Sequence, residues 1–237
     1  MRIGQWVWVI GFLWVNGLHA QTCAVPLGDS IVTIERIAHG SGKTFIHVHQ
    51  NEVTAKQAAL RVIEANGGSL LTLHHAGGGR NIVFRLRSVR YEFDPNRIYT
   101  ERGISKTLDM YSQDTPQAHA AVRRLADRIK AWLPEGKIIA VHNNSRYSWR
   151  DYCPGHPLAS NLRLMSRPHA DSMTNFYLVT QEQDYRRLKE LPVNSILQVR
   201  HPVDDGSLSV YLASRRYINV EAGYDQLAEQ IKLLQEV

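Results

Sequence analysis

Apolar residues in this sequence gather in short runs that alternate with longer segments of mixed character. A helical pattern fits residues 54–65, 115–133 and 224–235. Runs typical of strands cover residues 30–37, 44–49, 69–74, 81–87, 137–142, 175–180, 195–199, 207–213 and 217–220. This alternation predicts a single α/β domain, built on a mixed, mostly buried β-sheet flanked by helices.

The breaks between these segments agree with their assignment. Asn66-Gly67-Gly68 follows the first helical segment, and Thr115-Pro116 opens the second, which Pro134-Glu135-Gly136 closes. Glycine is common just past a helix end, and proline is common in a first turn. The polar stretch at residues 143–171 is longer than a simple connection, so it is either functional or disordered.

The first twenty residues have the pattern of a secretory signal peptide. Arg2 is their only charge, an apolar run spans Trp6–Val15, and Leu18-His19-Ala20 offers a cleavage point before Gln21. We therefore predict a leader at residues 1–20, a single mature domain at 21–237, and a periplasmic or secreted location. An uncleaved membrane anchor is the alternative, although the apolar run is short for a bilayer span.

Charge and cysteine content narrow the class of partner. Loss of Arg2 lowers the net charge from +6 to +5, and no Lys/Arg tract concentrates it, so nucleic acid is not indicated. An anionic cell-wall polymer is a more natural partner for an exported chain. Cys23 and Cys153, the two cysteines, predict one disulfide bond. Lipid attachment at Cys23 is the weaker alternative.

Three residues have the types and positions of metal ligands. His49 and Glu52 are three apart, where a predicted strand runs into a helix, and His142 ends another strand. Ligand sites in open α/β sheets lie at the carboxyl ends of strands, and a catalytic zinc takes three protein ligands plus one open position. The pattern predicts one zinc ion per chain on His49, Glu52 and His142. With eleven histidines in the chain, a chance H-x-x-E pair is the alternative.

Two further residues near these strands are candidates for a role in catalysis or beside the metal site. Glu221 follows the apolar strand at 217–220, where a carboxylate could act as a general base. An ordinary glutamate ahead of the last helix explains it almost as well. His47 shares a strand face with His49, and a hydrogen-bonded core histidine is the preferred interpretation over a role beside a metal.

The order of these motifs resembles the zinc carboxypeptidase superfamily, which includes carboxypeptidase A-type enzymes and the smaller succinylglutamate desuccinylase/aspartoacylase branch. The resemblance spans about Thr44 to Gln226 and suggests a small exported bacterial member. In chain order the matching positions are His49-x-x-Glu52, Arg80, Asn96-Arg97, His142 and Glu221.

The resemblance implies a role for each position outside the metal set. Arg80 would polarise the scissile carbonyl, Asn96 and Arg97 would grip a substrate carboxylate, and Glu221 would be the general base. The substrate-capping tyrosine of the family has no certain counterpart, since Tyr211 and Tyr217 both fit.

Together these features predict an exported zinc hydrolase. We expect it to cleave an amide bond in a small peptide or N-acyl amino acid with a free carboxylate, as a metallocarboxypeptidase or amidase, with murein peptides as candidate substrates. The alternative is a catalytically silent binding protein that uses the same cleft for ligand capture.

Overall fold

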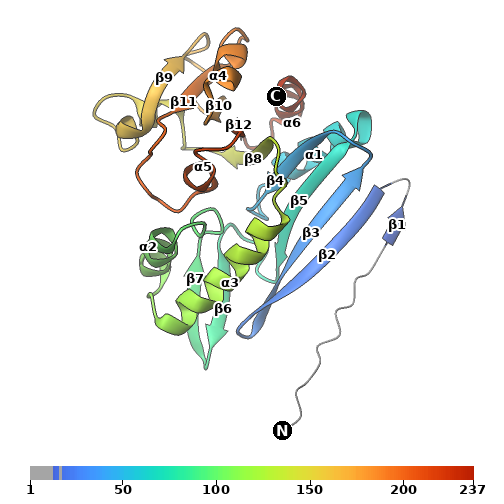
Figure 1. Cartoon of the computed structure of the whole chain (residues 1–237), viewed down its shortest axis with the longest axis vertical. Coiled ribbons are helices and arrows are strands. Elements are labelled where there is room, and N and C mark those ends of the chain that lie inside the picture. The colour runs from blue at the N-terminus through green and yellow to red at the C-terminus, as the bar shows by residue number, and fades with distance from the viewer. Residues whose placement is uncertain (1–12, 16–17) are drawn as a thin grey trace.

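A ten-stranded mixed β-sheet runs through the computed structural model, which describes residues 13–15 and 18–237 (Figure 1). Its spatial order is β1 (Leu13–Val15), β2 (Leu18–Leu27), β3 (Ser30–His39), β5 (Gly68–His75), β4 (Lys43–His47), β8 (Ile138–Asn144), β12 (Tyr217–Gly223), β10 (Phe176–Val179), β11 (Asn194–Gln198) and β9 (Leu162–Ser166). The four central strands β5, β4, β8 and β12 are parallel, whereas pairing toward both edges is largely antiparallel.

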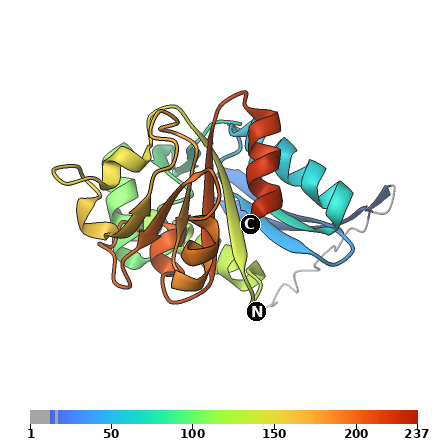
Figure 2. The ribbon, with the colours of Figure 1, turned by 90° about the horizontal axis from the view of Figure 1, so that it is seen from above.

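Helices cover both faces of this sheet. On one face, α1 (Val53–Asn66), α4 (Glu182–Leu188) and α6 (Leu227–Glu236) pack on a shared apolar core. Figure 2 shows α1 and α6 side by side there. The other face carries α2 (Glu101–Tyr111), α3 (Pro116–Trp132) and the hairpin of β6 (Ile82–Leu86) and β7 (Val89–Phe93). The central strands are therefore buried on both faces, as their near-continuous apolar runs require.

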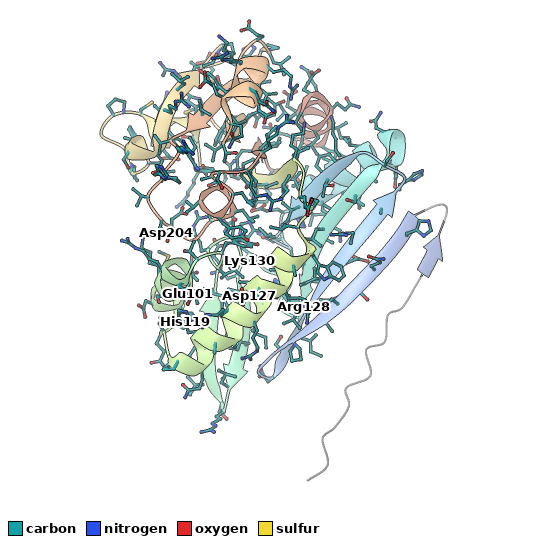
Figure 3. The ribbon with its side chains drawn as sticks, in the orientation of Figure 1. Glu101, His119, Asp127, Arg128, Lys130 and Asp204 are labelled. Atoms are coloured by element: carbon teal, nitrogen blue, oxygen red, sulfur yellow. The ribbon has the colours of Figure 1, made fainter. Side chains whose placement is uncertain are left out.

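Local sequence explains how the helices begin. Thr115 caps α3 by accepting a hydrogen bond from the Ala118 N–H, and Pro116 occupies the first turn. Thr100 caps α2 in the same way through Gly103. These two helices also share an ion pair between Glu101 and His119, whose Oε2 and Nε2 atoms lie 2.9 Å apart (Figure 3).

The structure confirms the predicted mixed α/β fold with a single large sheet. It also shows that residues 143–171 are ordered, since they contain two short 3₁₀ helices (Trp149–Tyr152 and Ala159–Asn161) and strand β9. Strand β2, hairpin strand β7 and helix α2 were not expected from the sequence.

One predicted strand, residues 207–213, is wrong. This segment contains a short helix, α5 (Leu208–Tyr211), which Ser207 caps by accepting from the Val210 N–H. Leu208 and Leu212 are both fully buried, and their spacing of four suits one helical turn as well as it suits a strand.

The predicted disulfide between Cys23 and Cys153 is also wrong, because both cysteines are free. Cys23 lies on β2 and packs on the core beneath α3, whereas Cys153 packs beside β10 and β11. In the sheet, β10 lies six strands from β2 and β11 lies seven, which is roughly 29–34 Å at about 4.8 Å per strand. A disulfide requires Cα atoms within about 7 Å.

The predicted leader lies mostly outside the described residues, so it stays a prediction. Among the residues that are described, no helix is both long enough and apolar enough to cross a bilayer.

Candidate metal centre and cavity

Two neighbouring parallel strands bring the three predicted metal ligands together. Strand β4 ends at His47, and the following turn carries His49 and Glu52 into α1, closed by a hydrogen bond from the Glu52 N–H to the His49 carbonyl (3.0 Å). His142 lies near the end of β8, which pairs directly with β4. Parallel pairing therefore places all three side chains at one edge of the sheet.

The facing atoms of these side chains lie at contact distance. His49 Nδ1 is 2.8 Å from Glu52 Oε1, His142 Nδ1 is 2.9 Å from Glu52 Oε2, and the two Nδ1 atoms are 3.2 Å apart. All three residues are buried, and one donor atom from each lies within 4.8 Å of the others. This group could hold one metal ion.

Polar neighbours fix the orientation of the group. Asp94, which the sequence analysis did not single out, accepts from His49 Nε2 at 2.8 Å. The Asn143 N–H donates to Glu52 Oε2 at 3.2 Å, and His47 is held between Thr72 Oγ1 and the Glu52 carbonyl at 3.0 Å each. His47 is thus the hydrogen-bonded core histidine that we preferred from the sequence.

Charge near the group shifts the pKa values of its members. Burial lowers the pKa of His49, but the Glu52 and Asp94 carboxylates outweigh that effect and raise it to about 9. For the Asp94 carboxyl, burial acts in the opposite direction and raises the pKa. The positive charges of His49, Arg80 and Arg97 outweigh burial and hold the pKa of Asp94 well below its usual range. A histidine that must lose a proton to bind metal makes metal affinity depend on pH.

Arg80 reaches the same group from the glycine-rich turn after β5. Its Nη1 lies 2.6 Å from Glu52 Oε1 and 3.1 Å from His49 Nδ1, and its Nη2 lies 3.2 Å from Asp94 Oδ2. The side chain is 43% exposed, so one side of the guanidinium faces the cavity. The structure therefore brings Arg80 together with the three candidate metal ligands.

Asn96 and Arg97 follow Asp94 in a tight turn. The Asn96 N–H donates to Asp94 Oδ1 at 2.7 Å, and Arg97 Nη1 donates to the Asn96 carbonyl at 3.0 Å. Arg97 Nε is 3.8 Å from Asp205 Oδ2, a loose ion pair across the cavity wall. A substrate carboxylate could compete for this guanidinium.

Glu221 occupies the register position beside His142, because β12 runs parallel to β8. It is only 4% exposed, and two amides hold its carboxylate: Asn144 Nδ2 at 2.8 Å and Asn219 Nδ2 at 2.9 Å. A buried carboxylate with two neutral donors is oriented without being paired with a cation.

One cavity of about 420 Å³ joins these groups. Every predicted catalytic, substrate-binding and metal residue lines it: His49, Glu52, Arg80, Asn96, Arg97, His142 and Glu221. Its wall also includes five residues that no sequence pattern indicated: Asn144, Tyr147, Tyr152, Asn219 and Asp205. Asp94 had one usable signal, its place two residues before the Asn96-Arg97 pair.

The two tyrosines that fitted the substrate-capping position, Tyr211 and Tyr217, lie in different surroundings. Tyr211 does not line the cavity but stacks on Tyr99, beneath Lys130. Tyr217 lines the cavity wall from β12 and is fully buried. Tyr224, not considered from the sequence, also lines the cavity; it is 39% exposed, and its hydroxyl accepts from Asn51 Nδ2 at 3.5 Å.

Comparison with protein-family models, with curated proteins and with solved structures finds no match to this chain.

Proposed function

We propose that this chain is an exported zinc-dependent hydrolase that cleaves an amide bond in a small peptide-like substrate bearing a free carboxylate. The observation that carries the proposal is the convergence, in one cavity, of a buried His–Glu–His group with an arginine and a second buried carboxylate. A metallocarboxypeptidase or amidase needs these parts together. Export and the basic net charge favour murein peptides as substrates, in the periplasm or outside the cell.

The donor set suits zinc. Two imidazole nitrogens and one carboxylate oxygen are borderline ligands of the kind that zinc prefers, and the three atoms lie close enough to share one ion. The hydrogen bond from His49 to Asp94 is the carboxylate–histidine support found around such sites. A zinc ion held by His49, Glu52 and His142 would supply Lewis-acid chemistry, polarising a carbonyl and acidifying a water molecule.

Glu221 is the general base in this proposal. Its carboxylate accepts a proton from the attacking water and returns that proton to the nitrogen of the leaving amine. Asn144 and Asn219 keep it aimed at the cavity, since each donates to a different oxygen of the carboxylate. Their neutrality leaves the carboxylate available as a base.

The arginines serve binding and charge stabilisation. Arg97, with Asn96 beside it, binds the substrate carboxylate through a planar guanidinium suited to that geometry. Arg80 donates toward the carbonyl oxygen as negative charge develops there, from the side of its guanidinium that faces the cavity.

Product analysis by mass spectrometry tests the proposal. Zinc-loaded protein is incubated with a mixture of murein fragments and N-acyl amino acids, beside a Glu221→Gln variant. We expect cleavage by the wild type alone, with zinc content equal in both proteins. Full turnover by Glu221→Gln removes Glu221 as the base. Ligand capture without any cleavage favours a binding protein instead.

A further inference from the structure

The cavity continues past Glu221 to an inner end that carries no formal charge. Tyr217, Asn219 and Glu221 are every second residue of β12, so their side chains lie on the same face of the sheet. They form one wall of the cavity, which extends from the Glu221 carboxylate along β12 toward Tyr217. The residues of this inner end are Asn161, Leu178, Gln198, Ser207, Ser209, Val210, Tyr217 and Asn219. Three of them are buried amides, Asn161, Gln198 and Asn219, and these are the groups that can recognise a ligand there.

The orientation of these amides follows from their partners. Asn219 Nδ2 donates to the Glu221 carboxylate, which can only accept. Gln198 Nε2 donates to the Ser209 carbonyl at 2.9 Å, which can also only accept. Asn161 Oδ1 already accepts from the Val203 N–H at 2.8 Å, which leaves the Asn161 Nδ2 as a donor. Asn219 Oδ1 has no hydrogen-bond partner among the described residues, but it is closed off from solvent. Gln198 Oε1 is therefore the acceptor that a ligand in the cavity can reach.

A ligand that covers Gln198 Oε1 without supplying a donor leaves that acceptor unpaired, which costs about 1–3 kcal/mol in general, so a ligand with an N–H or O–H is favoured. A ligand with an apolar end gains nothing from this oxygen.

The opposite wall is held in place by its own contacts. The loop at residues 204–209 is anchored where Thr100 Oγ1 donates to Asp204 Oδ1 at 2.8 Å, beside the start of α2 (Figure 3). A Cβ on Gly206 would lie 2.4 Å from the Gly103 Cα, so the loop packs directly on α2 at this point. A fixed wall lets the inner end discriminate between side chains of similar length.

The inner end lies between the two groups that orient the substrate. Asn96, next to Arg97, accepts from the Leu208 N–H at 3.3 Å, which joins the carboxylate-binding turn to this loop. Asn219 touches Glu221 on the other side. A residue whose carboxylate rests on Arg97 and whose amide nitrogen faces Glu221 has its side chain directed between them.

We propose that this inner end is a specificity pocket for a neutral side chain that donates hydrogen bonds, such as a primary amide. The inference rests on the proposed function for the placement of the carboxylate. We expect this pocket to exclude a side chain that ends in an ammonium group, because no carboxylate lies among the inner residues to offset the cost of burying a charge. Asp205, the nearest acid along the loop, faces Arg97 instead.

Calorimetric binding of free L-glutamine, L-methionine and L-lysine to the purified chain tests this directly. The three ligands share a carboxylate and have similar length, and none of them contains a peptide bond. We expect glutamine to bind at least about tenfold more tightly than methionine or lysine, equal to about 1.4 kcal/mol. Equal or tighter binding of methionine or lysine, or no binding of glutamine, overturns the proposal.

A variant pair assigns the effect to the amide. Gln198→Met should weaken glutamine binding about tenfold and leave methionine binding unchanged or tighter. Gln117→Met, the same change at an exposed position on α3, should alter neither. A glutamine preference that survives in folded Gln198→Met overturns the assignment. Because binding is measured without turnover, a chain that cleaves nothing yet prefers glutamine refutes the hydrolase and not the pocket.

Discussion

Asp94 gives the sharpest quantitative test of how the metal group is supported. Its Oδ1 accepts from His49 Nε2 at 2.8 Å, with both side chains buried, and its Oδ2 lies 3.2 Å from Arg80 Nη2. A hydrogen bond to a charged group is worth about 1.5–3 kcal/mol. Loss of such a partner typically lowers metal affinity about 10–100-fold, or about 1.4–2.8 kcal/mol, so the two estimates agree.

We therefore expect a graded response at this position. Asp94→Asn keeps an acceptor oxygen but loses the charge, and should weaken zinc binding about tenfold. Asp94→Ala loses both and should weaken it about 100-fold. Competition against a chromogenic chelator measures the affinities, and circular dichroism verifies the fold.

The chain offers a matched control in Asp114, whose carboxylate pairs with His119 Nδ1 at 3.0 Å on α3, outside the cavity. Asp114→Asn should leave zinc affinity unchanged. Wild-type affinity in a folded Asp94→Ala protein would refute the reasoning, as would an equal loss in Asp114→Asn.

Three further predictions concern binding, packing and pH. Arg97→Ala should raise KM about 10–100-fold for a carboxylate-bearing substrate but not for its amide-capped counterpart, and equal losses in steady-state kinetics would contradict its role. Leu125→Ala, on the fully buried face of α3, should lower the free energy of unfolding in urea by about 2–5 kcal/mol, and a loss below about 1 kcal/mol would argue against this core. The hydrogen bond with His74 lowers the pKa of Glu35 below its ordinary 4.5, so the Glu35 carboxylate stabilises the fold above that value and loses its contribution as pH falls through the lowered pKa. Glu35→Gln should thus be less stable at neutral pH by less than about 1 kcal/mol, with the gap closing in acid urea titrations; a gap that persists in acid would contradict this.

Most strands of the sheet could be predicted from the spacing of apolar residues along the chain, because that spacing reflects which faces of each strand are buried. Strands such as 137–142 and 217–220 are nearly continuous in apolar residues because both of their faces are covered, and the structure has them as β8 and β12. Helix α2 was not predicted because its buried face has only two large apolar residues, Ile104 and Leu108, which is too few for a clear helical pattern. Strand β2 was not predicted because its first residues overlap the predicted leader.

The candidate site was predictable where it depends on strand ends. His49 follows strand β4 and His142 lies near the end of β8, and parallel pairing of those strands brings them together. The wrong disulfide shows the limit of such reasoning, since a cysteine count says nothing about distance across a sheet. The roles of the Gln198 and Asn219 amides could not be predicted either, because those roles depend on hydrogen-bond partners that come together only in the folded chain.

The metal content of the purified chain tests the central claim most directly. Elemental analysis of the wild type and of His49→Ala, purified in parallel and checked for folding, compares the two. We expect close to one zinc per wild-type chain and almost none in His49→Ala. Equal metal content in the two proteins, or a wild type that takes up no zinc when zinc is supplied, would contradict it.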